Sequence, residues 1–262
     1  MGNSDPALTY LKSFGYSVVR LPRADIRPLL VLVLEGNRLS RLGDLATVLQ
    51  PGGTIALPTV KQDVPAANIA GQKSRDLSFG VGLSILGNII GAMGGSKLGL
   101  DVAYKNAKSI SFEFSDVLAD DVDLISLDQF LTDADVNPFS THVSRLLESD
   151  AVYVTSGVIK TKKFIIDART SDGTSVDVQI PEIQNLVGGN VKVGTSGESA
   201  SKVVYESAVP LAFGFQAARL YYEEGRYTAF KPLEPGQAGL EAARGARGAD
   251  YLSTDSPFAR LD

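Results

Sequence analysis

The chain has 262 residues and a formal net charge of −5, so it is poorly suited to neutralising phosphates, and we expect no nucleic-acid partner. The absence of cysteine excludes disulfides, thiolate metal sites and cysteine nucleophiles, and the single histidine, His142, excludes metal centres that need two histidines. The first residues lack a basic region followed by an apolar run, so we expect no secretory signal and a cytoplasmic location.

Four elements are predicted before residue 50. An Asp-Pro pair and a later glycine predict a short helix over residues 5–15, since proline is favoured at the first helical position. A strand is predicted over 17–21. The unbroken apolar run at 29–34 predicts a buried strand, and apolar residues at helical spacing predict a helix over 39–49.

Residues 77–96 contain no charged side chain, which raises the question of a transmembrane helix. Six glycines in this stretch would each cost a helix about 1 kcal/mol. Over 77–85, apolar residues alternate with glycine or serine, and this period of two is typical of a strand. A turn at 91–95 and renewed alternation over 98–104 and 110–114 complete a long predicted β-hairpin.

A second amphipathic hairpin is predicted after residue 150. Apolar and polar residues alternate over 151–168 and again over 176–180, with a turn at 170–173 between them. A further bend and strand are predicted over 187–193. Alternation of this kind fits an ordinary antiparallel sheet, and it also fits a transmembrane barrel with one face toward lipid.

Helices and strands complete the predicted domain. Residues 122–131 and 138–147 are predicted helices, and the second of them carries His142. Residues 203–205 and 211–222 are predicted as the final strands of the sheet.

No motif for nucleotide binding, metal binding or nucleophilic catalysis is complete in this sequence. Residues 91–97 resemble a phosphate-binding loop but lack its glycine before the lysine, and the aspartates at 116–135 lack a calcium-loop spacing. The sequence has no G-x-S-x-G motif whose serine His142 could activate as a general base. Carboxylate pairs remain open as an alternative, but nothing selects one pair. We therefore predict no enzyme and no catalytic, cofactor-binding or metal residues.

Charge is uneven near the N-terminus, where residues 1–41 carry six basic and three acidic side chains. Such an excess of basic side chains favours binding to an anionic membrane surface, by about 1 kcal/mol for each Lys or Arg near that surface. Ordinary solvated arginines are the alternative. The candidate basic membrane patch consists of Lys12, Arg20, Arg23 and Arg27.

The C-terminal region combines a flexible composition with an apolar end. Residues 232–249 are rich in Gly, Ala and Pro and predict an exposed linker that proteases can cut. The residues after it keep four large apolar side chains, which we expect to dock on the rest of the chain. These are Tyr251, Leu252, Phe258 and Leu261.

Several segments in this order resemble the gasdermins, and in particular the short bacterial gasdermins, over nearly the whole chain. The resemblance is carried by residues 16–23, the charge-free hairpin at 77–104, residues 150–163 and residues 209–221. No single motif carries it. The resemblance implies an α+β fold, namely a twisted, mostly antiparallel central sheet surrounded by helices, with a C-terminal peptide packed on it.

The resemblance also implies an autoinhibited precursor of a membrane pore. Residues 1–244 would form the pore-forming domain and 245–262 the inhibitory peptide. A partner protease, expected to be caspase-like, would cut near Arg244 or Arg247, although Asp250 would suit an aspartate-specific enzyme. The chain would be monomeric and cytoplasmic at rest. After cleavage it would bind anionic lipid of the inner membrane and assemble with other copies into a large ring, which forms a β-barrel pore. The pore would kill the cell in defence against phage.

The two hairpins would supply the barrel strands. Their expected lipid face consists of Leu77, Phe79, Val81, Leu83, Ile85, Leu98, Leu100, Val102, Val152, Val154, Val158, Phe164, Ile166, Val176, Val178 and Ile180. Bacterial gasdermins typically carry a palmitoylated cysteine near the N-terminus, but residues 1–4 contain no thiol, so this modification is not carried over. A soluble α+β binding or scaffold protein without membrane activity is the competing interpretation.

Overall fold

The computed structural model describes residues 15–35, 38–67, 69–71, 73–74, 76–139, 141–196 and 199–232. Its strands are β1 (Ser17–Arg23), β2 (Leu30–Glu35), β3 (Arg38–Asp44), β4 (Leu49–Gln50), β5 (Val60–Pro65), β6 (Leu77–Ser78), β7 (Ser109–Ser115), β8 (Leu118–Val122), β9 (Asp135–Val136), β10 (Val152–Arg169), β11 (Val191–Ser196), β12 (Ser199–Glu223) and β13 (Arg226–Pro232). Its helices are α2 (Leu45–Val48), α3 (Phe79–Ala92), α4 (Leu100–Ala103), α5 (Leu124–Asp133), α6 (Thr141–Leu147) and α7 (Ile180–Val187).

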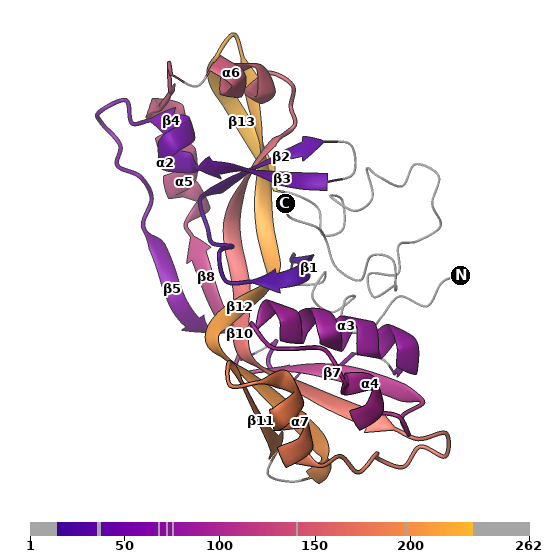
Figure 1. The fold of residues 1–262 in the computed structure, drawn as a ribbon. Helices are drawn as coiled ribbons and strands as arrows, with labels where there is room; N and C mark the ends of the chain where they lie inside the picture. The colour runs from indigo at the N-terminus through magenta and orange to yellow at the C-terminus, as the bar shows by residue number, and fades with distance from the viewer. Residues whose placement is uncertain are drawn as a thin grey trace.

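Two long strands, β10 and β12, run side by side along the molecule and organise the sheet (Figure 1). β1, β11 and β13 also pair with β12, whereas β2, β7 and β8 pair with β10. Every strand pairing within the described residues is antiparallel. The predicted α+β class with a mostly antiparallel central sheet is therefore confirmed.

Three apolar cores lie along these two strands. The lower core in Figure 1 lies under α3, α4 and α7 and includes Phe164 and Tyr205. The upper core lies under α2, α5 and α6 and includes Phe130 and Val152. The third core includes Val158 on β10. We call α3, α4 and α7, together with β6, β7, β11 and the parts of β10 and β12 that they cover, the lower lobe.

Most predicted strands are present. Residues 17–21 lie in β1, 29–34 largely in β2, and 151–168 in β10. The bend and strand predicted at 187–193 end in β11. The two predicted final strands join into the single strand β12, because bulges against β10 let one chain segment change direction without ending its pairing.

The helix predicted over 39–49 is wrong for most of its length. β3 occupies Arg38–Asp44 and only the single turn α2 follows. β3 pairs with β2 from Leu39 opposite Leu34 onward, so the apolar strand β2 gains a hydrogen-bonded neighbour. This tertiary pairing outweighs the helical spacing of the leucines, because local helix propensity is only a weak determinant of structure.

The helices predicted at 122–131 and 138–147 are confirmed with shifted bounds. α5 begins after Asp123, whose Oδ1 accepts a hydrogen bond of 2.8 Å from the backbone N–H of Ser126. This contact satisfies a donor that the first helical turn leaves unpaired. α6 contains the backbone of His142.

Three predicted hairpin strands are wrong in this structure. Residues 98–104 form no strand, because α4 occupies Leu100–Ala103. Residues 79–92 form α3, which buries Ile85, Leu86, Ile89 and Ile90 at helical spacing. Residues 176–180 form no strand, and a single bridge joins Arg169 to Ser175 before α7 begins. Residues 79–92 therefore cover the sheet as a helix, and residues 176–179 are irregular chain that leads into α7, where the sequence alternation predicts strands.

A matched pair of glycines in α3 tests the packing of this helix. A Cβ added at Gly82 would lie 2.5 Å from Ile110 Cβ, so Gly82→Ala is expected to lower the free energy of unfolding by about 1–3 kcal/mol through overpacking. Within the described residues, a Cβ at Gly80 meets nothing within 4 Å. Gly80→Ala should therefore raise the free energy of unfolding by up to about 1 kcal/mol through helix propensity. Urea unfolding measures both values, and equal effects would contradict the close approach of α3 to β7.

Candidate membrane-inserting regions

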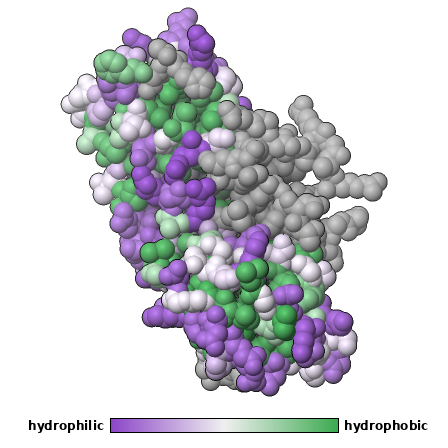
Figure 2. All heavy atoms as spheres, viewed as in Figure 1, coloured by the Kyte–Doolittle hydropathy of each residue, from purple (hydrophilic) through white to green (hydrophobic). Residues whose placement is uncertain are grey.

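The lower lobe contains four adjacent strands with one apolar face. β7, β10, β12 and β11 lie in this order, and their register places Phe114, Phe164 and Tyr205 in one row. We call this the covered face, and it consists of Ile110, Phe112, Phe114, Phe164, Ile166, Ala168, Val203 and Tyr205. α3, α4 and α7 pack over it, and Figure 2 shows apolar residues gathered in the lower part of the molecule within a polar surround.

Aromatic contacts hold the upper end of the covered face. Phe114 stacks on Phe213 with ring centroids 4.0 Å apart, and it meets Phe164 edge-on at 5.6 Å. The hydroxyls of Tyr104, which follows α4, and Tyr205 lie 2.8 Å apart inside the core. Burial raises the pKa of both tyrosines, so each hydroxyl keeps its proton, and the contact gives each buried oxygen a hydrogen-bond partner. Sequence patterning gave no signal for this pair.

The opposite face of the same four strands is mainly polar, although Ile165 and Val204 also lie on it. Its side chains alternate with those of the covered face, because successive residues of a strand point to opposite sides. We call it the polar face, and it carries Ser111, Glu113, Lys163, Asp167, Lys202 and Glu206. Ion pairs cross its strands, with Lys202 Nζ 3.2 Å from Glu113 Oε2 and Lys163 Nζ 2.6 Å from Asp116 Oδ2.

Asp167 is the most buried carboxylate of the polar face. Lys73 Nζ lies 2.8 Å and Arg169 Nη2 3.1 Å from its Oδ2. Burial alone would raise the pKa of Asp167, but the hydrogen bonds from Lys73 and Arg169 outweigh burial, and the pKa lies below its usual range. A lowered pKa in the folded state means that the ionised carboxylate stabilises the fold.

The contribution of Asp167 should depend on pH in one direction. The stabilisation is complete above the ordinary carboxyl pKa of about 3.9 and is lost as the pH falls through the lower folded-state pKa. We therefore expect Asp167→Asn to lower the free energy of unfolding at pH 7, and the deficit to shrink below about pH 4. Urea unfolding of both proteins between neutral and acid pH measures this, and a deficit that grows on acidification would contradict it.

Segment 77–92 carries two patterns at once. As helix α3 it buries Ile85, Leu86, Ile89 and Ile90 against the sheet. As an extended strand it would place Leu77, Phe79, Val81, Leu83 and Ile85 on one face and glycine or serine on the other. The same residues therefore suit a helix on the covered face and a strand beside it.

Most of the predicted lipid-face residues are buried at rest. The buried members are Leu77, Ile85, Leu100, Val152, Val154, Val158, Phe164, Ile166, Val176 and Val178. The partly buried members, all packed on the lower core, are Phe79, Val81, Leu83 and Ile180. Leu98 and Val102, beside and within α4, are 77% and 64% exposed. The set is not brought together as one surface, because Val152, Val154 and Val158 lie in the other two cores.

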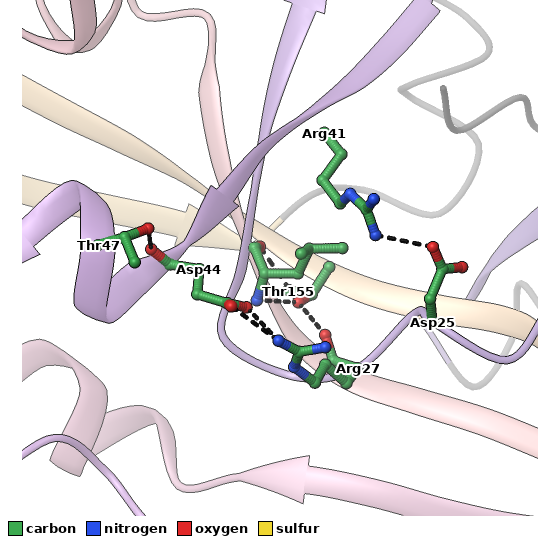
Figure 3. A network of polar contacts seen from close by, with 7 residues as sticks. Asp25, Arg27, Arg41, Asp44, Thr47 and Thr155 are labelled. Carbon is green, nitrogen blue, oxygen red and sulfur yellow. Dashed lines mark hydrogen bonds and ion pairs between the residues drawn. The ribbon is translucent and has the colours of Figure 1, made fainter. Parts of the chain in front are cut away.

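Two members of the predicted basic patch are ion-paired in the structure. Arg27 Nη2 lies 2.7 Å from Asp44 Oδ1, and Arg41 Nη1 lies 2.7 Å from Asp25 Oδ2 (Figure 3). Arg23 Nε also lies 2.9 Å from Asp25 Oδ1. Burial alone would raise the pKa of Asp25, but the arginines beside it lower the pKa overall. Intramolecular carboxylates thus already oppose these cations, and their contact with lipid stays a prediction.

The same network anchors the link between β1 and β2 to β10. The hydroxyl of Thr155 on β10 donates to the carbonyl oxygen of Arg27 at 2.6 Å and accepts from the N–H of Leu30 at 2.9 Å (Figure 3). Thr155 is fully buried. Sequence alternation identified residues 151–168 as a strand but gave no reason to single out this threonine.

Other predicted sites lie outside the described residues. They are Lys12, Arg244, Arg247, Tyr251, Leu252, Phe258 and Leu261, together with the side chains of Arg20 and His142. Within the described ranges, no helix is both long and apolar enough to cross a membrane. In the same ranges, no three His, Asp or Glu side chains are grouped so that they could hold a metal ion.

Comparison with known proteins identifies the family to which this chain is related. The family model described as "Bacterial Gasdermin Family" matches residues 19–226. A protein named gasdermin bGSDM from a Desulfuromonadales bacterium is 56% identical and covers 98% of this chain and 97% of its own. A protein of the same name from Lysobacter enzymogenes is 43% identical, and the match covers 95% of this chain and 92% of that protein.

A solved structure supports the same fold. The bacterial gasdermin from Bradyrhizobium tropiciagri has a TM-score of 0.57 to this structure at 18% identity, covering 87% of this chain and 92% of that one.

Proposed function

Because the chain belongs to the bacterial gasdermin family, which is pore-forming and not enzymatic, we propose that this structure is the resting form of a pore that opens after C-terminal cleavage. The observation that carries the proposal is the covered face. Four adjacent strands present one apolar face and one polar face, and the helices over the apolar face contain sequence that also alternates as strands do.

In the proposed transition, α3, α4 and α7 leave the covered face and extend. Residues 77–115 and 151–193 then form two long hairpins, and strands of about 9–11 tilted residues suffice to cross a bilayer. Within these hairpins, the residues of the covered face turn toward lipid and those of the polar face toward the water-filled lumen. Edge-to-edge pairing of many copies closes a barrel, which satisfies backbone groups that lipid cannot.

Removal of the tail is the proposed trigger. A caspase-like protease would cut at Arg244 or Arg247, and Tyr251, Leu252, Phe258 and Leu261 would no longer hold the resting packing. Each well-buried apolar side chain contributes about 1.5–3 kcal/mol, and a cleaved peptide escapes by dilution. The active form would leave the cytoplasm for anionic lipid of the inner membrane and kill the cell in defence against phage.

Controlled cleavage tests the proposal. A recognition sequence for a specific protease is placed after Arg244 in the full chain, and the product, residues 1–244, is called the shortened chain. We expect the shortened chain to release dye from vesicles of phosphatidylglycerol and cardiolipin, and to arrest growth when expressed in bacteria, whereas the uncut chain does neither. A folded shortened chain that releases no dye would contradict the pore and favour a scaffold role.

A further inference from the structure

Two turns from the two prospective hairpins touch each other in the lower lobe. The first, residues 94–99, joins α3 to α4, and the second, residues 186–191, joins α7 to β11. The N–H of Ser96 donates to the carbonyl oxygen of Val187 at 3.0 Å. Asn190 Nδ2 donates to the carbonyl oxygen of Gly94 at 3.0 Å. The two turns are thus hydrogen-bonded although they are far apart in sequence.

The contact needs glycine on the first turn. A Cβ at Gly95 would lie 2.8 Å from Val191 Cγ2 and 2.9 Å from the carbonyl oxygen of Val187. A Cβ at Gly99 would lie 2.7 Å from Leu186 Cδ2, and the φ of Gly99 is +83°, where other residues are strained. Backbone therefore packs directly on the second turn.

The second turn is itself held in shape by one glutamine. Gln184 Nε2 donates to the carbonyl oxygen of Val191 at 2.8 Å, and Gln184 Oε1 accepts from the N–H of Val193 at 2.9 Å. These bonds fix the end of α7 to the start of β11. The first turn consequently docks on a preformed platform.

We propose that residues 94–99 and 186–191 form a clasp that makes the two hairpin segments leave the sheet together. This inference rests on the proposed function. Ile90, Leu100, Ile183 and Val187 share the lower core, so lifting one turn alone would break the clasp hydrogen bonds and uncover apolar surface of the other. Release of either segment is therefore coupled to release of its partner.

Amide hydrogen exchange on the full chain tests the coupling without any pore. We expect Asn190→Ala to speed exchange in both turns by about five- to tenfold, as loss of one net hydrogen bond allows. Asn137→Ala is the matched control, because Asn137 Nδ2 donates to the carbonyl oxygen of Thr47 at the same 3.0 Å outside the lower lobe. Faster exchange in residues 186–191 alone would overturn the clasp.

A reversible cross-link tests its role in activation. A Cβ at Gly94 would lie 3.8 Å from Asn190 Cβ, and this is the usual distance between the two Cβ atoms of a disulfide. The chain itself has no cysteine, so within one chain the two introduced cysteines can pair only with each other. The two turns leave the sheet together but must then separate, because residues 77–115 and 151–193 extend as two distinct hairpins. After tail removal, oxidised Gly94→Cys/Asn190→Cys should therefore release dye on the order of tenfold more slowly than its reduced form. The single Gly94→Cys variant controls for strain, because the φ of Gly94 is +79°.

The outcomes separate the two proposals. Equal leakage by the oxidised and reduced double variant would overturn the clasp while the pore stands. Absence of leakage from the unmodified shortened chain would overturn the pore, and the exchange experiment would still decide whether the two turns open together.

Discussion

Val102→Arg is expected to abolish dye release by the shortened chain while leaving the resting fold intact. Val102 is 64% exposed on α4, so the arginine replaces a surface side chain and should change the free energy of unfolding by about 0.5 kcal/mol or less. In the barrel, Val102 would face lipid, where arginine costs about 2–4 kcal/mol per copy. That corresponds to roughly 30- to 1,000-fold less insertion.

The neighbouring residue supplies the control. Asp101 is also exposed in α4, but an extended strand would point it toward the lumen. Asp101→Arg therefore introduces the same side chain one position away and should leave dye release largely unchanged. Equal loss of leakage in both variants would contradict the assigned faces. Val158 is unsuitable for this test, because it is fully buried at rest.

Phe164→Ala is expected to lower the free energy of unfolding of the full chain by about 3–5 kcal/mol. Phe164 is fully buried on β10 and meets Phe114 edge-on at the upper end of the covered face. Truncation leaves a cavity that the surrounding strands cannot close, since both neighbours of β10 at this point are paired to it.

An exposed phenylalanine makes this measurement specific. Phe139 is 91% exposed, so Phe139→Ala should change the free energy of unfolding by about 0.5 kcal/mol or less. Thermal or urea unfolding of both variants gives the comparison. Similar losses in the two variants would contradict the role of the lower core in the stability of the resting form.

Strands that are paired on both sides were predictable from the sequence. Alternation and apolar runs identified β2, β10 and most of β12. A strand buried on one face has apolar residues at every second position, and a strand buried on both faces has a continuous apolar run. The resemblance to gasdermins, carried by the order of several segments, was confirmed by the family match. The ion pair of Arg27 was not predictable, since its partner Asp44 lies at the end of β3, 17 residues away, and only the fold brings the two together.

The wrong predictions have a common physical origin. Residues 39–44 carry a helical pattern but pair with β2, and residues 79–92 carry a strand pattern but pack as α3. Local periodicity is weak where two periods fit the same apolar residues, and tertiary contacts then decide. In α3, the second period coincides with the strand that the proposed pore requires, so the ambiguity is itself consistent with a change of structure.

Lipid exposure along residues 98–105 tests the central claim most directly. Because the chain lacks cysteine, single cysteines at the exposed positions 98, 101, 102 and 105 can carry an environment-sensitive dye, read out with vesicles whose lipids bear a quencher. After tail removal, we expect quenching at 98 and 102 and little at 101 and 105, whereas a helix would place all four on one side. Vesicle leakage accompanied by quenching with helical spacing, or by none, would contradict the conversion of α4 into a membrane strand.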